Sequence, residues 1–189
     1  MYQQIKIMLV NVITREIAKP FVIKHHYTHA IGKTSLICGM WDDIRLVGVI
    51  TFGQPSGRLV ASSLGHTEKT CWEFLRMVVL DEIETPRTHF MSKAIKILKQ
   101  KHPEVKLLVT YADQTEGHTG MVYKAGSWIY HGMTAKKYHY VDLEGKRINK
   151  RIPWDAAKKL GVTEKIYANA KQLTKIIELP KLRFIRQLY

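Results

Sequence analysis

The segment from Leu107 to Gly132 carries the residue types best suited to chemistry. Its sequence, LLVTYADQTEGHTGMVYKAGSWIYHG, runs from an apolar strand pattern through a polar turn into a short helical pattern rich in aromatics. Asp113 follows the strand directly, where α/β sheets commonly present ligand-binding groups. We expect Asp113 to act as a general base or a metal ligand, although Asp is also common as a turn or N-cap carboxylate. His118 could polarise a substrate or begin the helix.

Two charged residues, Glu73 and Arg76, interrupt the apolar run WEFLRMV. Strict strand alternation places them on opposite faces of the strand. Arg76 is the stronger functional candidate, because a charge among apolar residues needs a partner such as Asp113, another acceptor or a phosphate. A structural ion pair with a neighbouring strand explains Arg76 nearly as well. Tyr123, in the short helical pattern, could hydrogen-bond a group donor or simply pack in the core.

The charge of the chain is strongly basic. Thirty Lys and Arg against 16 Asp and Glu give a net charge of +14. A basic domain of this size typically meets a polyanion, because each neutralised phosphate releases counterions. The densest basic run contains Lys136, Lys137, Lys146, Arg147, Lys150 and Arg151. We expect this run to contact a nucleic-acid backbone, as Arg58 in the loop QPSGR could also do, with a merely solvated basic face as the alternative.

Composition and length indicate one domain. The 189 residues suffice for one full hydrophobic core, so we predict a single domain. Within this domain we distinguish a core region over 1–132 and a basic C-terminal extension over 133–189. Cys38 and Cys71 have no metal-binding or disulfide spacing, which favours a reducing cytoplasm. The apolar run near the N-terminus is too short for a signal or membrane helix, so we expect no membrane association.

The pattern of apolar and breaker residues predicts an α/β sandwich, in which a mixed central sheet is flanked by helices. Strands are predicted over 4–13, 35–41, 44–53, 71–82, 105–111, 127–132 and 136–146. Helices are predicted over 14–25, 88–102, 118–125, 155–160 and 163–177. Residues 53–70, dense in Gly, Pro and Ser, are predicted to form a loop, and Thr88 is predicted to cap the helix that follows it.

This order of elements resembles the GNAT superfamily of N-acetyltransferases, and several segments resemble its phage Mom family of DNA adenine modification proteins. These segments are KHHYTHA, GVITFGQPSG, WEFLRMVVLDE, YADQTEGHTGMVYKAGSWIYHG and LPKLRFIRQ. They span most of the chain in the family's order. The resemblance implies transfer of an acetamide-like, carbamoylmethyl group to N6 of adenine in double-stranded DNA, which protects phage DNA from restriction in the host cytoplasm.

The resemblance also suggests site residues. His26 and Tyr27 match the family's His-Tyr pair, and together with Asp113 they would supply the N and O ligands that non-haem iron accepts. His25 and His29 have the i, i+4 spacing of zinc-binding pairs, but no third ligand accompanies them, so zinc is disfavoured. An enzyme that modifies a base typically flips it out of the duplex, which requires a pocket beside the site.

One segment departs from the superfamily pattern. Ordinary GNAT enzymes hold the coenzyme A pyrophosphate with a glycine-rich turn before a helix, whereas ETPRTHFMSKA has no glycine. The donor is therefore open between acetyl-CoA and another small-group donor. Backbone N–H groups at that helix start, with Arg87, Thr88 and Ser92, could still hold a phosphate or another anion.

Two other functions compete with DNA adenine modification. The first is an acyl-CoA-dependent N-acetyltransferase that acts on a protein or small amine, and the second is a non-catalytic DNA-binding protein. The sequence leaves the oligomeric state open, with a homodimer as one option.

Overall fold

The computed structural model describes residues 8–189, which form two compact units. Unit 1 contains the chain up to Ala112 together with residues 120–132 and 183–189. Unit 2 contains residues 113–119 and 133–182. The longer segment of unit 2 begins at residue 133, where the basic C-terminal extension was predicted to begin. The extension does not lie wholly in unit 2, however, because residues 183–189 belong to unit 1. That the whole chain behaves as one domain stays a prediction.

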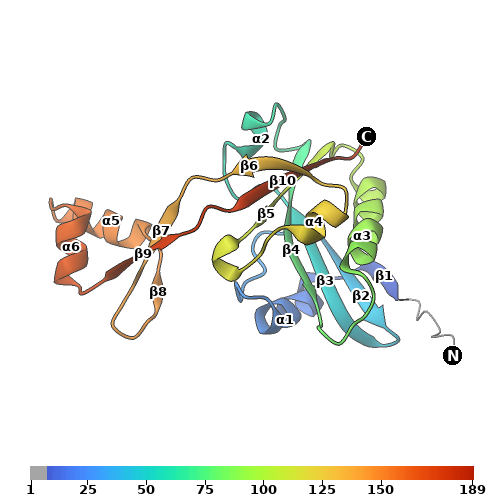
Figure 1. The fold of residues 1–189 in the computed structure, drawn as a ribbon, viewed down its shortest axis with the longest axis horizontal. Coiled ribbons are helices and arrows are strands. Elements are labelled where there is room, and N and C mark those ends of the chain that lie inside the picture. Colours follow the sequence, from blue (N-terminus) through green and yellow to red (C-terminus); the bar gives the residue numbers. More distant parts are fainter. Residues whose placement is uncertain (1–7) are drawn as a thin grey trace. The chain divides into compact units, whose positions relative to one another are not determined.

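A seven-stranded sheet forms the centre of unit 1 (Figure 1). Across the sheet the strands are β1 (Leu9–Val12), β2 (Leu36–Asp42), β3 (Arg45–Gly53), β4 (Cys71–Val79), β5 (Leu107–Ala112), β10 (Leu182–Gln187) and β6 (Ile129–Met133). β1 to β4 pair antiparallel, whereas β4 and β5 are parallel. The mixed α/β class predicted from sequence is therefore confirmed.

Helices cover both faces of this sheet. They are α1 (Arg15–His25), α2 (Val60–Ser63), α3 (Arg87–Lys101) and α4 (Met121–Ala125). Val49 of β3 packs in a buried cluster with Ala18 and Val22 of α1. Its neighbour Gly48 instead lies against Phe90 of α3, so α1 and α3 occupy opposite faces, as strand alternation requires. None of the described helices has the length and apolarity that crossing a membrane demands.

Unit 2 is built around a three-stranded antiparallel sheet. Its elements are the 3₁₀ helix η1 (Gln114–Glu116), β7 (Lys137–Val141), β8 (Arg147–Ile148), α5 (Arg151–Lys159), α6 (Glu164–Ala170) and β9 (Thr174–Glu178), with strand order β8-β7-β9. On one face, Glu178 is buried and pairs with His139 and Arg147. On the other, the Tyr138 hydroxyl donates to Glu164 of α6. The Tyr138–Glu164 contact attaches α6 to the sheet.

Several predicted elements need correction. Residues 53–70 contain α2, and the helix predicted over 155–160 begins at Arg151. The helix predicted over 163–177 ends at Ala170, because Gln172 adopts a left-handed φ of 53° and the β-branched run that follows pairs with β7 as β9. The final residues form β10. Residues 4–7 of the first predicted strand lie outside the described part of the chain.

Candidate active site

β4 and β5 diverge in the middle of the sheet. Their parallel register covers only Cys71–Glu73 against Leu107–Val109, although β4 continues to Val79. Beyond Glu73, β4 makes no further ladder hydrogen bonds to β5. Where two parallel strands diverge in this way, backbone groups inside the sheet lack a strand partner, and a ligand can supply the hydrogen bonds instead.

A β-bulge at Leu75 changes the faces of the neighbouring charges. Phe74 pairs with Phe52 and Arg76 pairs with Thr51, so Leu75 is the extra residue on β4. Glu73 pairs with Gly53, which lies two residues from Thr51 and shares its face. Glu73 and Arg76 consequently lie on the same face of the sheet. The expectation of opposite faces is wrong because it assumed unbroken alternation.

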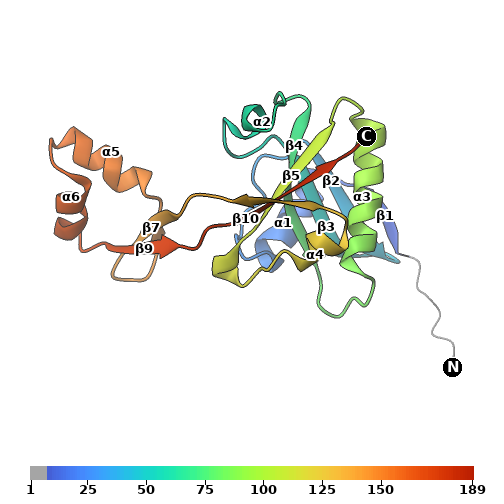
Figure 2. The same ribbon diagram turned by 45° about the horizontal axis from the view of Figure 1, so that its top comes forward.

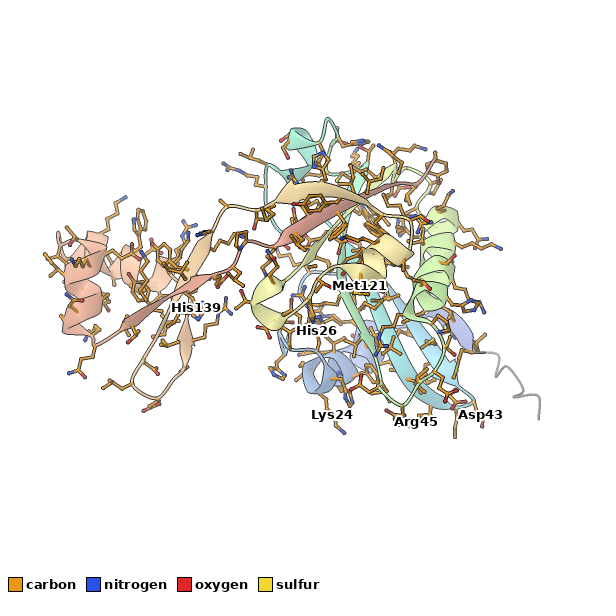
Figure 3. All side chains as sticks on the ribbon, in the orientation of Figure 1. Lys24, His26, Asp43, Arg45, Met121 and His139 are labelled. Carbon is orange, nitrogen blue, oxygen red and sulfur yellow. The ribbon has the colours of Figure 1, made fainter. Side chains whose placement is uncertain are left out.

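Arg76 fastens the loop after α1 to β4. Its Nε donates to the carbonyl of Ala30 at 3.2 Å, and its Nη1 donates to the carbonyl of Leu75 at 2.7 Å. The same loop holds His26, which is buried, stacks on Tyr27 and lies at the end of α1 (Figure 3). The Thr28 N–H donates to Nδ1 of His26 at 3.1 Å, so Nδ1 is an acceptor. Arg76 thus ties the His-Tyr pair to the bulged strand.

Glu73, which sequence reasoning ranked below Arg76, is buried where β4 and β5 diverge. Only 6% of its surface is exposed, and its Oε2 accepts a hydrogen bond of 2.7 Å from the backbone N–H of Ser56. Burial, followed by the charge of Glu73, raises the pKa of the Tyr111 phenol to about 12. A buried carboxylate at the last paired position of two diverging strands is placed to take a proton. A carboxylate within the apolar run WEFLRMV was the sequence feature that could have drawn attention to Glu73.

Tyr123 of α4 lies in an aromatic cluster beside the bulge. Its ring contacts those of Phe74, Trp128 and Phe184 at centroid distances of 5.5–6.0 Å. Its phenol hydrogen-bonds Thr110, whose hydroxyl donates to the carbonyl of Phe74 at 3.0 Å. Burial raises the pKa of Tyr123, so the phenol stays protonated and can donate a proton.

Asp113 belongs to a network inside unit 2. Its Oδ2 lies 2.5 Å from Nζ of Lys181, and its Oδ1 accepts from the N–H of Thr115 at 3.1 Å. Burial alone would raise the pKa of Asp113, but the hydrogen bond and charge of Lys181 outweigh it, and the pKa lies below its usual value. A carboxylate with a lowered pKa is a weak base. The geometry therefore favours the turn-carboxylate interpretation.

His118 does not begin the following helix. Its N–H donates to the carbonyl of Asp113 at 3.1 Å, in the connection between η1 and α4, which starts only at Met121. Asp113 and His118 belong to unit 2, whereas the other catalytic candidates belong to unit 1. That all of them share one site stays a prediction.

Two of the three proposed iron ligands, His26 and Asp113, already use donor atoms within the protein. Among residues 8–189, no three His, Cys, Asp or Glu side chains are grouped closely enough to hold a metal ion. Nδ1 of His26 accepts from Thr28, and both carboxylate oxygens of Asp113 are bonded within unit 2. These donors do not fit an iron centre.

The start of α3 is poorly suited to a pyrophosphate. Pro86, and not Thr88, stands at the N-cap position, and no side chain caps the helix. Arg87 is paired with Asp81 at 3.3 Å, and Ser92 is exposed. The preceding loop also carries Glu82, which pairs with Arg45 at 2.6 Å, and the exposed Glu84. An anion at this helix start would have to compete with Asp81 for Arg87.

The residues expected to contact DNA are exposed, but three of them also have protein partners. Arg147 pairs with Glu178, Arg151 lies 3.7 Å from Asp155, and the Lys150 ammonium lies 5.0 Å from the Tyr138 ring centroid. Lys136, Lys137 and Lys146 are exposed in unit 2, and Arg58 is exposed in the loop before α2 of unit 1.

The Asp113–Lys181 pair gives a test of the turn-carboxylate role. Asp113→Asn is expected to lower the free energy of unfolding by about 2 kcal/mol at pH 7, because the half-buried Lys181 ammonium loses its charged acceptor. The Asp113 pKa lies below its ordinary value of 3.8, so this contribution is present above that pH and is lost as the pH falls below it. Urea unfolding between pH 3 and 7 measures the difference.

The exposed Asp155 serves as the control, since Asp155→Asn breaks a long i, i+4 contact and should change stability by well under ~1 kcal/mol. An Asp113→Asn protein as stable as the wild type at pH 7 would rule out a structural role for the carboxylate.

Comparison with known proteins matches two groups. The model of the Mom protein family matches residues 7–189. The methylcarbamoylase Mom of Escherichia phage Mu is 26% identical over 126 residues, which cover 64% of this chain and 52% of that protein. The chain thus spans about half the length of this curated relative.

Solved acetyltransferases share the fold. One from Bacillus subtilis, in complex with CoA, has a TM-score of 0.51 at 8% identity and covers 96% of this chain and 99% of its own. The ribosomal-protein-alanine N-acetyltransferase of Brucella melitensis has a TM-score of 0.52 at 8% identity, with 95% and 99% covered. At such identities the likeness establishes the fold alone, which is the GNAT-like fold predicted from sequence.

Proposed function

Because this chain belongs to the Mom protein family, we propose that it is a transferase which places a carbamoylmethyl group on N6 of adenine in double-stranded DNA. The observation that carries the proposal is the family match over residues 7–189. The name of the phage Mu relative, a methylcarbamoylase, supports the nature of the group. The modification would protect phage DNA from restriction enzymes in the host cytoplasm.

The chemistry requires a base and an acid. Transfer forms one bond between N6 and the donor carbon, breaks the bond from that carbon to its leaving group, and removes one N6 proton. Glu73, buried at the end of the β4–β5 pairing, accepts that proton. Tyr123, which burial keeps protonated, donates to the leaving group. His26 and Tyr27 lie in the loop that Arg76 fastens to β4 through the Ala30 carbonyl, and we place the adenine amine on their side of Glu73.

The donor must carry the –CH2–CONH2 group on its leaving group, because an acyl thioester would pass on its carbonyl carbon and leave an N6-amide. A CoA thiol as that leaving group is supported by the shared fold with an acetyltransferase solved in complex with CoA. The ladder between β4 and β5 ends at Glu73, and the carbonyls of Phe74 and Leu75 already accept from Thr110 and Arg76. An extended donor chain would therefore hydrogen-bond the backbone of β4 beyond Leu75. Because Arg87 is already paired with Asp81, donor binding is expected to rely little on a pyrophosphate at the start of α3.

A second candidate function is an acyl-CoA-dependent N-acetyltransferase for a protein or small amine. The acetyltransferase fold favours it. The excess of basic residues, 12 against 5 acidic ones over 133–182, favours a polyanionic substrate instead. Turnover of acetyl-CoA with amines in the absence of DNA would support this second function.

Nucleoside mass spectrometry provides the direct test. DNA from cells that express the protein is expected to contain a deoxyadenosine heavier by one carbamoylmethyl group and to resist restriction enzymes that cut at adenine-containing sites. DNA from cells that express Glu73→Gln serves as the matched control. Deoxyadenosine of unchanged mass, with restriction sensitivity intact, would contradict the proposal.

A further inference from the structure

α5 and α6 form a helix-turn-helix within unit 2. The segment WDAAKKLGVTEKIYANA places α5 (Arg151–Lys159) and α6 (Glu164–Ala170) on either side of a four-residue turn. Gly161 in this turn has a φ of 68°, a left-handed conformation that glycine adopts without strain. The two helices run in clearly different directions in both ribbon views (Figure 2). Two short helices joined through a glycine turn are the architecture of a common DNA-reading motif.

Small residues and a cap hold the two helices together. Ala157 of α5 and Ala168 of α6 are buried, which lets the helix backbones approach closely. The Thr163 hydroxyl accepts a hydrogen bond of 3.3 Å from the N–H of Ile166 and thereby fixes the start of α6. The Tyr138 contact to Glu164 anchors the same end of α6 to β7. The orientation of α6 is therefore set by packing.

The outer face of α6 presents side chains suited to base edges. Lys165 and Asn169 are exposed, lie four residues apart and so share one face, and Ile166 beside them is 56% exposed. Within residues 8–189, neither the Lys165 ammonium nor the Asn169 amide has a hydrogen bond or ion pair to the protein. Asn pairs with adenine, Lys with guanine, and an apolar side chain contacts the thymine methyl in the major groove.

The surroundings of α6 match a duplex in charge. Residues 150–172 contain six Lys and Arg against two carboxylates. Both carboxylates already have partners, Asp155 with Arg151 and Glu164 with Tyr138. Lys159 at the end of α5 is exposed, and so is Lys158, whose ammonium lies 5.4 Å from the Trp154 ring centroid. Contacts from such lysines to phosphates position a protein on DNA without reading its sequence.

We propose that α6 enters the major groove and sets the sequence context in which adenine is modified. The inference deepens the proposed function, on which it rests for the identity of DNA as the substrate. Lys165 and Asn169 read base edges, while α5 contacts the backbone. Unit 2 is thus the part of the chain that chooses where along the DNA modification occurs.

The test is selection from a pool of randomised DNA duplexes with the full-length protein. The wild type is expected to enrich a short motif, and a Lys165→Ala/Asn169→Ala double variant is expected to lose about tenfold or more of that preference. Alanine favours helix, so the variant should stay folded, which circular dichroism verifies. Lys96→Ala, an exposed lysine on α3 of unit 1, should leave the motif unchanged.

Sequencing of modified adenines in genomic DNA gives the second readout. In the double variant, total modification should fall by no more than a few fold while its sequence context broadens. If the wild type enriches no motif, or if the variant keeps the wild-type motif, the inference is overturned. The two readouts can also disagree. If the wild type enriches a motif that the variant loses, but neither protein modifies adenine, the reading role of α6 stands and only the proposed function is refuted.

Discussion

Replacing Glu73 by glutamine is expected to slow DNA modification by about 10²–10⁴-fold, the usual contribution of a positioned general base. Glutamine has nearly the shape of glutamate and can still accept the Ser56 N–H, so the loop before α2 keeps its attachment. What the variant lacks is the capacity to take a proton from the N6 amine. The rate of modified-nucleoside formation on duplex DNA, measured with saturating donor, checks this expectation.

The controls for Glu73 separate chemistry from architecture. Tyr123→Phe removes the proton donor but keeps the ring contacts with Phe74 and Phe184, so its rate should fall less than that of Glu73→Gln when the leaving group is a good one. Glu73→Gln should unfold at wild-type urea concentrations within error, whereas Tyr123→Phe should lose about 1 kcal/mol with its hydrogen bond to Thr110. A Glu73→Gln protein with wild-type rate would show that the carboxylate only anchors Ser56, and another base would have to be sought.

The elements that sequence reasoning predicted well are those with an unbroken period. The apolar face of α3 follows the helical repeat, and β2, β3 and β5 are continuous apolar runs bounded by turn residues, so local pattern and tertiary packing agree. The two helices of unit 2 were also predicted, with Gly161 as the stop between them. The reading motif they form was therefore present in the sequence as local signals, and only their mutual packing had to be supplied by the structure.

The site was harder to predict because it depends on breaks in the pattern. The bulge at Leu75 brings Glu73 and Arg76 onto one face, and a bulge has no signature in a run as apolar as WEFLRMV. The partner of Asp113 is Lys181, 68 residues further along the chain, so its ion pair could not be seen from local spacing. The insertion of β10 between β5 and β6 is likewise a long-range event, because β10 follows β6 by about fifty residues.

Gly120→Ala is expected to lower the free energy of unfolding by about 3 kcal/mol or more, the largest stability effect we foresee for a single methyl group. Gly120 has a φ of 76°, where an L side chain costs roughly 1–2 kcal/mol. A Cβ there would also lie 2.4 Å from two ring carbons of Phe184 in β10, which overpacks the core by a further ~1–3 kcal/mol. A buried aromatic ring on a central strand cannot move aside as the end of a flexible side chain can.

Gly117 provides the matched control, because it has nearly the same φ of 74° but no atom within 4 Å of the added Cβ. Gly117→Ala should therefore cost only the strain of about 1–2 kcal/mol, and the excess at Gly120 isolates the clash with Phe184. Adding Phe184→Leu should recover part of the Gly120→Ala loss, a non-additivity expected only for residues in contact. Equal losses for both glycines in urea unfolding would mean that Phe184 does not press on the start of α4, and the placement of Tyr123 on that helix would then lack its support.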